Sequence, residues 1–244
     1  MSLRSRIRGP APRGAGADRG AGMSDELHVF EGHGIRVSWS RARCIHSAEC
    51  VRGLPLVFQP GSRPWIKPDA GAAAKIAAVI ERCPTGALHY ERLDGGSAEA
   101  PPSANTVTPE PDGPLLLRGQ IEIVDEQGNL VLRDTRVALC RCGGSANKPF
   151  CDGSHRMRGF SDDGEVFEGA VKPGEHPEPV LRLTIRPGGP LKARGALVVR
   201  SPDGLVRVTG GDAAFCRCGA SRNKPFCDRS HERIAFEAET RDSG

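Results

Sequence analysis

The chain has 244 residues, a formal net charge of +4, 38% hydrophobic residues and only 5% aromatic residues. This composition is thin for one large core, and small units that gain stability from a bound metal fit it better. The modest charge gives little support to nucleic-acid binding beyond a tail. No apolar run reaches the length of about 18 residues that a membrane span needs, so we expect no membrane association.

The N-terminal residues are rich in Gly, Ala, Arg and Pro. Such a composition cannot bury a core, so residues 1–24 are predicted to form a disordered basic tail. The tail lacks the apolar region of a secretory signal. Met23 opens a better-formed segment and is an alternative start of the chain.

Residues 25–93 are predicted to form the first folded unit. Apolar and polar residues alternate over Ile35–Trp39, which predicts a strand, and Leu88–Tyr90 is a second strand candidate. Between them, apolar residues recur on one helical face over residues 70–83. Asp69 is the expected N-cap of this helix, and the proline after Cys83 ends it.

The rest of the chain is organised as a tandem repeat. Residues 94–112 have the composition of a linker. Hairpins are predicted around residues 121–132 and 197–206, and the segment 180–185 is a further strand candidate. The predicted parts are a first repeat at 113–160, a connecting strand segment at 161–188, a second repeat at 189–236 and a tail at 237–244. Repeats with so little core each are expected to pack around a pseudo-twofold axis.

Each repeat contains one cysteine tract, CRCGGSANKPFCDGSH at 140–155 and CRCGASRNKPFCDRSH at 216–231. Both have the spacing C-x-C-x8-C-x3-H. The candidate ligands are Cys140, Cys142, Cys151 and His155 in the first tract and Cys216, Cys218, Cys227 and His231 in the second. The chain has nine cysteines, an odd number that argues against a purely disulfide framework. Thiolate and imidazole ligands suit metal binding in a reducing compartment, so we expect a cytoplasmic location.

Local geometry supports metal binding in each tract. Cys140 and Cys142 are two residues apart, so an extended segment points both the same way. If Asp152 caps a helix start, Cys151 and His155 lie one turn apart on one side. Ser145 and nearby amides are expected to donate hydrogen bonds to sulfur, and Lys148 and Lys224 to remain solvated. From spacing alone, structural zinc in a Cys3His set and an iron–sulfur cluster both remain open.

Both tracts resemble the CDGSH iron–sulfur domain family, the mitoNEET-like proteins. The family pattern C-x-C-x2-[ST]-x3-P-x-C-D-G-[STA]-H is met in full by the first tract, and the second departs from it only at Arg229, where the family has Gly. The resemblance implies a 2Fe–2S cluster in each repeat, bound by three Cys and one His. Tandem copies resemble the monomeric members of the family, whose two halves mimic a homodimer.

The single His ligand has consequences for such a cluster. A neutral imidazole in place of a thiolate leaves less negative charge, which should raise the reduction potential. Protonation of the imidazole competes with iron, so His155 and His231 are the expected points of acid lability. A cluster carrier or redox sensor that releases 2Fe–2S through these residues is therefore an alternative to electron transfer.

The remaining cysteines are Cys44, Cys50 and Cys83. Proline follows Cys83, as it follows the closing ligand of bacterial ferredoxin runs, and Ser47 falls at the middle ligand position. Residues 28–92 resemble single-cluster ferredoxins, in particular the divergent mono-cluster domain found beside CDGSH repeats. Three thiolates are enough for a 3Fe–4S cluster, and a 4Fe–4S cluster would take His46, Ser47 or solvent as fourth ligand.

These observations predict an α+β protein with a ferredoxin-like N-terminal domain and a β-rich tandem CDGSH unit. We expect an electron carrier and not an enzyme, with no catalytic residues, two 2Fe–2S clusters and one 3Fe–4S or 4Fe–4S cluster. The expected partner is a redox protein or an apo-acceptor of clusters, and the chain is expected to be a monomer with an internal pseudo-dimer. A structural zinc protein is the remaining alternative.

Overall fold

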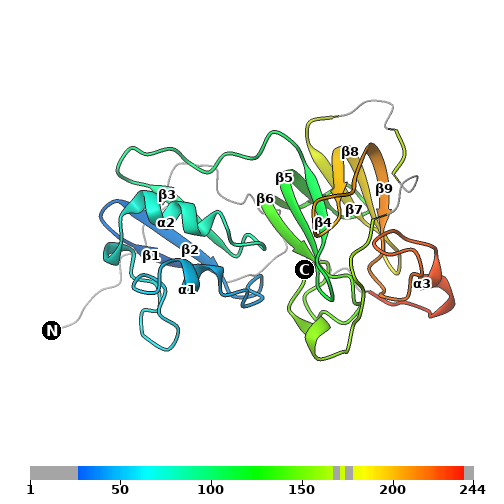
Figure 1. Ribbon diagram of the computed structural model, residues 1–244, viewed down its shortest axis with the longest axis horizontal. Coiled ribbons are helices and arrows are strands. Elements are labelled where there is room, and N and C mark those ends of the chain that lie inside the picture. Colours follow the sequence, from blue (N-terminus) through cyan, green and yellow to red (C-terminus); the bar gives the residue numbers. More distant parts are fainter. Residues whose placement is uncertain (1–26, 167–170, 174–177, 239–244) are drawn as a thin grey trace.

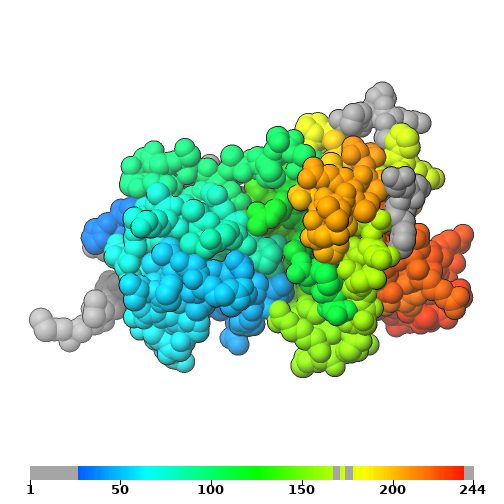
Figure 2. All heavy atoms as spheres, in the orientation of Figure 1, coloured from blue at the N-terminus to red at the C-terminus, as the bar shows by residue number. Residues whose placement is uncertain are grey.

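The computed structural model describes residues 27–166, 171–173 and 178–238 (Figure 1). The predictions for the tail at 1–24, for Met23 and for residues 239–244 lie outside this part of the chain. Two groups of strands lie side by side, an N-terminal group and a larger group formed by the rest of the chain. The space-filling view shows the two groups in direct contact (Figure 2). No helix in the described ranges is long and apolar enough to cross a membrane.

The N-terminal group is a three-stranded antiparallel sheet with short helices packed on it. Its strands are β1 (Leu27–Glu31), β2 (Ile35–Ser40) and β3 (Leu88–Arg92), in the order β1-β2-β3. Its helices are α1 (Glu49–Gly53), the 3-10 turn η1 (Pro68–Ala70) and α2 (Ala73–Ile80). The predicted strands at 35–39 and 88–90 are confirmed as β2 and β3, whereas β1 was not predicted.

Helix α2 buries Ile76, Ala77, Val79 and Ile80 in the core of this sheet. The helical face is therefore confirmed, but the predicted N-cap is wrong. The helix begins at Ala73, and Asp69 instead accepts hydrogen bonds from the backbone N–H and the ring of His33. Proline at the start of η1 fixes a tight turn before the helix, which places Asp69 too early to cap it.

The larger sheet contains both predicted hairpins. Its strands are β4 (Thr106–Pro109), β5 (Leu115–Val124), β6 (Leu130–Leu139), β7 (Leu181–Ile185), β8 (Leu191–Arg200) and β9 (Arg207–Phe215). Strands β5 and β6 form the first hairpin, and β8 and β9 form the second. Strands β4 and β7 each pair with both β5 and β8, so these four strands close into a ring around a shared apolar core.

The segment 94–112 is more structured than its composition predicts. It contains β4, and Glu99 and Asn105 within it are buried. The Asn105 amide donates to the carbonyl oxygens of Pro179 and Ala196, and its Oδ1 accepts from the N–H of Gln120. Composition predicted a linker because these partners are distant in sequence and leave no local pattern.

The two Arg-Gly pairs of the repeats mark matching irregularities in β5 and β8. Strand registers shift after Arg118 and after Arg194, where a glycine follows with positive φ. A Cβ on Gly119 would lie 2.1 Å from Asn105 Oδ1, and one on Gly195 would lie 2.2 Å from the carbonyl oxygen of Val180. Glycine is therefore required at both register shifts.

Candidate metal centres

The four candidate ligands of each tract meet as two pairs. Sγ of Cys140 and Cys142 are 3.8 Å apart, and those of Cys216 and Cys218 are 3.7 Å apart. In each tract the third cysteine and the histidine form the other pair, with 3.4 Å between Sγ and Nδ1. Ligands on one tetrahedral metal ion are separated by ~3.8 Å for two thiolates and ~3.6 Å for a thiolate and an imidazole. Each pair therefore has the spacing of two ligands on one ion.

The two pairs of a tract do not converge on a single point. Among the described residues, no group of three or more His, Cys, Asp or Glu side chains is arranged to hold one metal ion. A structural Cys3His zinc site would need all four donors around one ion. The donor set fits two metal ions, with one pair of ligands on each, better than it fits a single zinc.

The vicinal thiols share a proton in each repeat. The hydrogen bond between the two thiols lowers the pKa of one member of each pair, Cys140 in the first repeat and Cys218 in the second. A lowered thiol pKa favours the thiolate form that ligates metal. Burial raises the pKa of Cys151 to about 11 and lowers the pKa of His155, which favours the neutral imidazole that ligates metal.

Each ligand loop is held by a buried serine whose predicted role was different. The Ser145 hydroxyl donates to the carbonyl oxygen of Phe150 at 2.7 Å and accepts from the N–H of Asn147. Ser221 makes the matching bonds with Phe226 and Asn223. The prediction that the Ser145 side chain donates to sulfur is therefore wrong, because its hydroxyl is used to close the loop.

Backbone amides do point at the sulfurs, as predicted. The N–H of Gly144 lies 3.4 Å from Cys142 Sγ, and the N–H of Gly153 lies 3.4 Å from Cys151 Sγ. The expected helix after Asp152 is a single 3-10 turn, η2 (Ser154–Arg156). The N-cap is Gly153 and not Asp152, so the predicted cap is wrong, although Asp152 Oδ1 accepts a hydrogen bond from the N–H of Ser154 at 2.9 Å. The second tract has the matching short helix α3 (Ser230–Arg233).

Arg229 keeps the backbone geometry of the glycine that it replaces. Its φ is 68°, compared with 89° at Gly153, and its N–H lies 3.4 Å from Cys227 Sγ. The side chain turns outward and pairs with Glu232. The departure from the family pattern therefore leaves the amide–sulfur contact of the second tract in place.

Arginines between the paired cysteines are buried, which the sequence pattern did not reveal. Arg141 and Arg217 are each no more than 2% exposed, and they donate to the carbonyl oxygens of Gly113 and Gly189. Arg141 also pairs with Asp162. Ala238 stands at the position that corresponds to Asp162, and burial lowers the pKa of Arg217 to about 10.

The two ligand loops touch along their backbones. Cys142 and Cys218 form an antiparallel bridge, and Gly143 and Gly219 follow them with φ of 77° and 81°. A Cβ on Gly143 would lie 2.5 Å from the carbonyl oxygen of Cys218, and one on Gly219 would lie 2.7 Å from that of Cys142. The candidate centres of the two repeats are therefore held next to each other.

The lysines beside the tracts are tied to aromatic rings and not simply solvated. Lys148 donates to the carbonyl oxygen of Ser145, and its ammonium lies 5.9 Å from the ring centroid of Phe236. Lys224 lies 6.0 Å from the ring centroid of Phe160. Each ring belongs to the other repeat, so these contacts join the two ligand loops.

Cys44, Cys50 and Cys83 are brought together by the N-terminal core. Cys83 is buried in that core, and Cys44 and Cys50 pack against it. Burial and the charges of Cys83 and Cys44 raise the pKa of Cys50 to about 11. A cubane cluster takes each thiolate on a different iron, so its ligands surround the cluster and do not converge on one ion.

The candidates for a further ligand at these cysteines differ in their contacts. His46 Nδ1 lies 4.0 Å from Cys44 Sγ. The carbonyl oxygen of Ser47 accepts a hydrogen bond from Arg52 at 2.9 Å. The Thr85 hydroxyl, which was not singled out from the sequence, lies 3.6 Å from Cys83 Sγ and accepts from the N–H of Ala87. The bond from Ala87 leaves the hydroxyl proton free to point at the sulfur.

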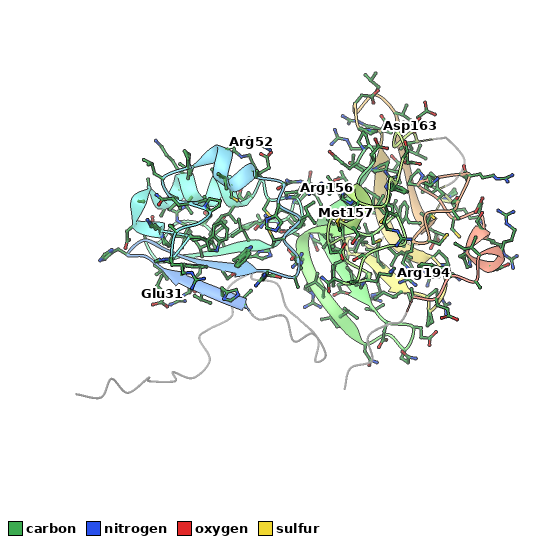
Figure 3. The ribbon with its side chains drawn as sticks, turned by 90° about the horizontal axis from the view of Figure 1, so that it is seen from below. Glu31, Arg52, Arg156, Met157, Asp163 and Arg194 are labelled. Atoms are coloured by element: carbon green, nitrogen blue, oxygen red, sulfur yellow. The ribbon has the colours of Figure 1, made fainter. Side chains whose placement is uncertain are left out.

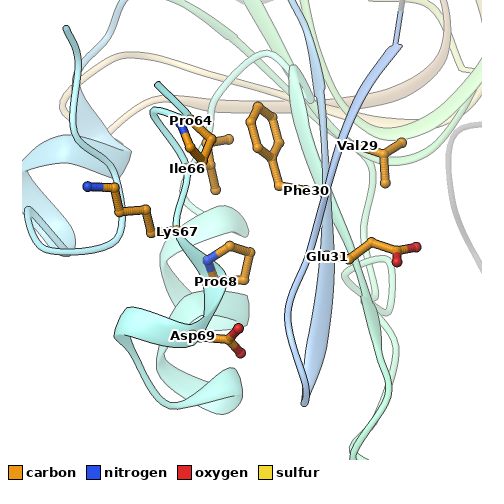
Figure 4. A pocket seen from close by; sticks show the side chains of 8 residues that line it. All are labelled: Val29, Phe30, Glu31, Pro64, Ile66, Lys67, Pro68 and Asp69. Carbon is orange, nitrogen blue, oxygen red and sulfur yellow. The ribbon is translucent and has the colours of Figure 1, made fainter. Parts of the chain in front are cut away.

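A groove elsewhere in the N-terminal group contains none of these candidate ligands. It lies between β1 and residues 64–69 (Figure 4). Its lining consists of Val29, Phe30, Glu31, Pro64, Ile66, Lys67, Pro68 and Asp69. No cysteine faces it, so the metal centres have no part in this groove.

Comparisons with known proteins agree with this arrangement. Residues 30–93 match the family model described as "Divergent 4Fe-4S mono-cluster", and residues 112–156 and 188–232 match "Iron-binding zinc finger CDGSH type". The chain belongs to the CDGSH iron–sulfur domain family and carries a divergent 4Fe–4S mono-cluster domain at its N-terminal side.

Two curated relatives are similar to a quarter of the chain. They are the "Uncharacterized protein YjdI" of Escherichia coli strain K12 and of Escherichia coli O157:H7. Each is 43% identical over 61 residues, which are 25% of this chain and 80% of the relative. No solved structure matches the chain.

Proposed function

We propose that this chain is an electron-transfer protein with two 2Fe–2S clusters and one cubane-type cluster, and that it turns over no substrate. The observation that carries the proposal is the division of each tract into two ligand pairs with single-ion spacing. When bound, such clusters accept and release single electrons. Each Cys-x-Cys pair would hold one iron of a repeat, and the following Cys and His would hold the other through Sγ and Nδ1.

The residues around each tract favour one-electron chemistry without substrate binding. Cys140 and Cys151 are almost fully buried, and His155 is 6% exposed, so solvent is largely excluded from the first site. Amide N–H groups point at the sulfurs, and the charge of Arg217 acts on Cys140 and Cys218, which stabilises the reduced and more negative state.

The tandem unit supports a monomeric carrier with an internal pseudo-twofold axis. Strand β4 is antiparallel to β5 and parallel to β8, whereas β7 is parallel to β5 and antiparallel to β8. This exchange of roles is what a twofold axis between the repeats would produce. We propose an α+β fold with an N-terminal domain at 25–93 and two repeats at 113–160 and 189–236. Strand β4 belongs to the tandem unit. A cytoplasmic location and a redox-protein partner complete the proposal.

An anaerobic redox titration followed by visible absorption and EPR tests electron transfer. The proposal predicts reversible reduction at both 2Fe–2S sites and at the N-terminal site, without loss of iron. Bleaching that does not reverse on reoxidation would contradict a carrier role. Incubation of the holo-protein with an apo-ferredoxin tests the alternative, because transfer of 2Fe–2S would favour a cluster carrier.

Replacing the histidine ligand tests the assignment within the repeats. His155→Cys puts a thiolate in place of a neutral imidazole, so the cluster should remain and its reduction potential should fall. The second repeat, with His231 unchanged, is the internal control. Protein-film voltammetry should show one 2Fe–2S wave moving to lower potential and one unchanged. Two unchanged waves would contradict the role of His155.

The cluster type of the N-terminal site depends on whether His46 contributes. With His46 as fourth ligand the site would hold 4Fe–4S, and with three thiolates alone it would suit 3Fe–4S. The position of His46 beside Cys44 Sγ favours the first arrangement. We expect His46→Ala to convert an EPR-silent oxidised site into one with an oxidised 3Fe–4S signal. An EPR spectrum that is the same before and after the substitution would exclude His46 as a ligand.

A further inference from the structure

A buried charge network joins the N-terminal group to the first repeat. Arg43 Nη1 donates to Asp134 Oδ2 at 2.6 Å, and Arg136 Nη2 donates to Glu99 Oε2 at 2.7 Å. His89 Nε2 lies 3.1 Å from Asp134 Oδ2. All five residues are at most 9% exposed. Each guanidinium group is paired with a carboxylate, so no charge of these two pairs is left without a partner in the interior.

Arg136 extends from β6 of the first repeat into the loop that carries Cys83. Its guanidinium donates to the carbonyl oxygen of Cys83 at 3.0 Å, to that of Leu88 at 2.9 Å and to that of Ile80. Ile80 is the last residue of α2, Cys83 is the candidate ligand, and Leu88 is the first residue of β3. Because the donors of a guanidinium have a fixed planar geometry, Arg136 fixes the three points relative to one another.

The charge of Arg136 also lies close to Cys83. Arg136 Nη2 donates to Glu99 Oε2 at 2.7 Å, and an arginine side chain is always charged in proteins. A fixed positive charge beside a thiolate ligand stabilises the more negative state of that ligand's site.

The loop of Cys44 rests on the same repeat. Ile45 packs against Ala138 and Cys151. Ile45 directly follows the candidate ligand Cys44, so it links Cys44 to the candidate ligand Cys151 of the first repeat. Arg156 donates to the carbonyl oxygen of Ile45 at 3.0 Å, and Figure 3 shows Arg156 at the boundary between the two groups of strands. The N-terminal ligand loops therefore contact the ligand loop of the first repeat directly.

The second repeat lacks this docking surface. Gly210 and Asp212 stand in β9 where Asp134 and Arg136 stand in β6. There the connecting segment takes the equivalent place, because a Cβ on Gly210 would lie 2.3 Å from Val171 and the N–H of Lys172 donates to the carbonyl oxygen of Asp212 at 2.9 Å. The attachment of the N-terminal group to one repeat is therefore built into the sequence.

We propose that Arg136 is a positioning residue for the N-terminal metal site, so that the first repeat completes this site and pairs it with the site of Cys151 and His155. The proposal rests on the cluster content proposed above. In this arrangement the first repeat lies between the N-terminal site and the second repeat, and electrons would pass through the three sites in chain order.

The test compares full-length variants by EPR and by reduction potential of the N-terminal cluster. Arg136→Met combined with Glu99→Gln removes the guanidinium without leaving a buried carboxylate unpaired, and Arg136→Lys retains charge without the three-way contact. Arg133→Met is the matched control, because Arg133 lies on the same strand with a side chain 54% exposed and paired with Glu122. The visible absorption of both repeats serves as the internal reference.

We expect the double variant to shift the reduction potential of the N-terminal cluster and to reduce the EPR intensity of that cluster by more than half. Arg136→Lys should give a smaller change in both quantities. Arg133→Met should match the wild type in both. A double variant with the wild-type signal and potential would overturn the proposal. Loss of all three clusters together would also overturn it, because Arg136 would then be needed only for folding. A wild-type chain without an N-terminal cluster would contradict the proposed function itself.

Discussion

At the scale of single residues, the two repeats differ where the family pattern changes. Gly153 and Arg229 occupy the same left-handed turn, which glycine adopts without cost and other residues adopt with strain. A Cβ on Gly153 would meet only the Arg156 side chain, at 3.8 Å, so space is not the obstacle. The difference between the repeats at this position is therefore conformational and not steric.

This difference predicts opposite effects for reciprocal substitutions. Arg229→Gly should raise the free energy of unfolding by about 1 kcal/mol, because the left-handed strain is removed and the exposed pair with Glu232 contributes little. Gly153→Arg should lower it by a similar amount. Denaturant unfolding of both variants measures the two effects, and equal signs for the two substitutions would contradict this explanation.

The contacts of the buried arginines could not be predicted from the cysteine motif. The spacing in each tract predicts which cysteines and histidine lie together, because that part of the geometry depends on near neighbours in sequence. Arg141 reaches Gly113 and Asp162, and Arg43 reaches Asp134, across separations that leave no local pattern. The interior polar contacts of the sites could not be predicted for that reason.

At the scale of elements, β6 connects the tandem unit to the N-terminal group through Asp134. Burial alone would raise the pKa of Asp134, but the charges of Arg43 and His89 oppose it, and the net pKa lies well below its ordinary value of 3.8. A carboxyl group whose pKa is lower in the folded state stabilises the fold above its unfolded pKa. That contribution is lost as the pH falls through the folded pKa.

We therefore expect Asp134→Asn to lower the free energy of unfolding by about 3 kcal/mol at neutral pH, because Arg43 loses its buried partner. The difference from the wild type should shrink as the pH falls below about 4, because the carboxyl group is then protonated in the unfolded chain while it stays ionised in the folded one. Urea unfolding across this pH range measures both effects. Asp163→Asn, at an exposed position, is the control, and a difference independent of pH would contradict the assignment.

The contact between the ligand loops also makes a prediction at this scale. Gly143→Ala places a Cβ against the carbonyl oxygen of Cys218 and strains a residue with positive φ. We expect a loss of about 2 kcal/mol or more in the free energy of unfolding. Gly128→Ala, at a position that also has positive φ but has no atoms within 4 Å, isolates the strain. Equal losses in thermal unfolding would mean that the loop contact is unimportant.

The elements show where sequence reasoning succeeds and where it fails. The hairpins β5–β6 and β8–β9 were predicted because alternation and turn residues are local signals. Strand β4 was read as linker, because its partners are β5 and the distant β8. Strand β1 was not predicted, and its exposed positions 27 and 29 are apolar, which obscures the expected pattern.

At the scale of the whole molecule, three candidate centres are held by one chain in a fixed sequence of contacts. The N-terminal cysteine loops touch the ligand loop of the first repeat, and that repeat touches the second through Cys142 and Cys218. The ring of strands around the shared core and the buried charge network make both contacts part of the folded structure. This sequence of contacts supports the proposed relay between the N-terminal site and the sites of the two repeats.

The central claim is that these centres are iron–sulfur clusters and not single zinc ions. Iron, acid-labile sulfide and zinc should be counted per chain in protein purified without oxygen, with EPR of the same sample. Two 2Fe–2S clusters and one 3Fe–4S or 4Fe–4S cluster predict about seven or eight irons, about eight sulfides and no stoichiometric zinc. A colourless protein with zinc and no iron would contradict the account.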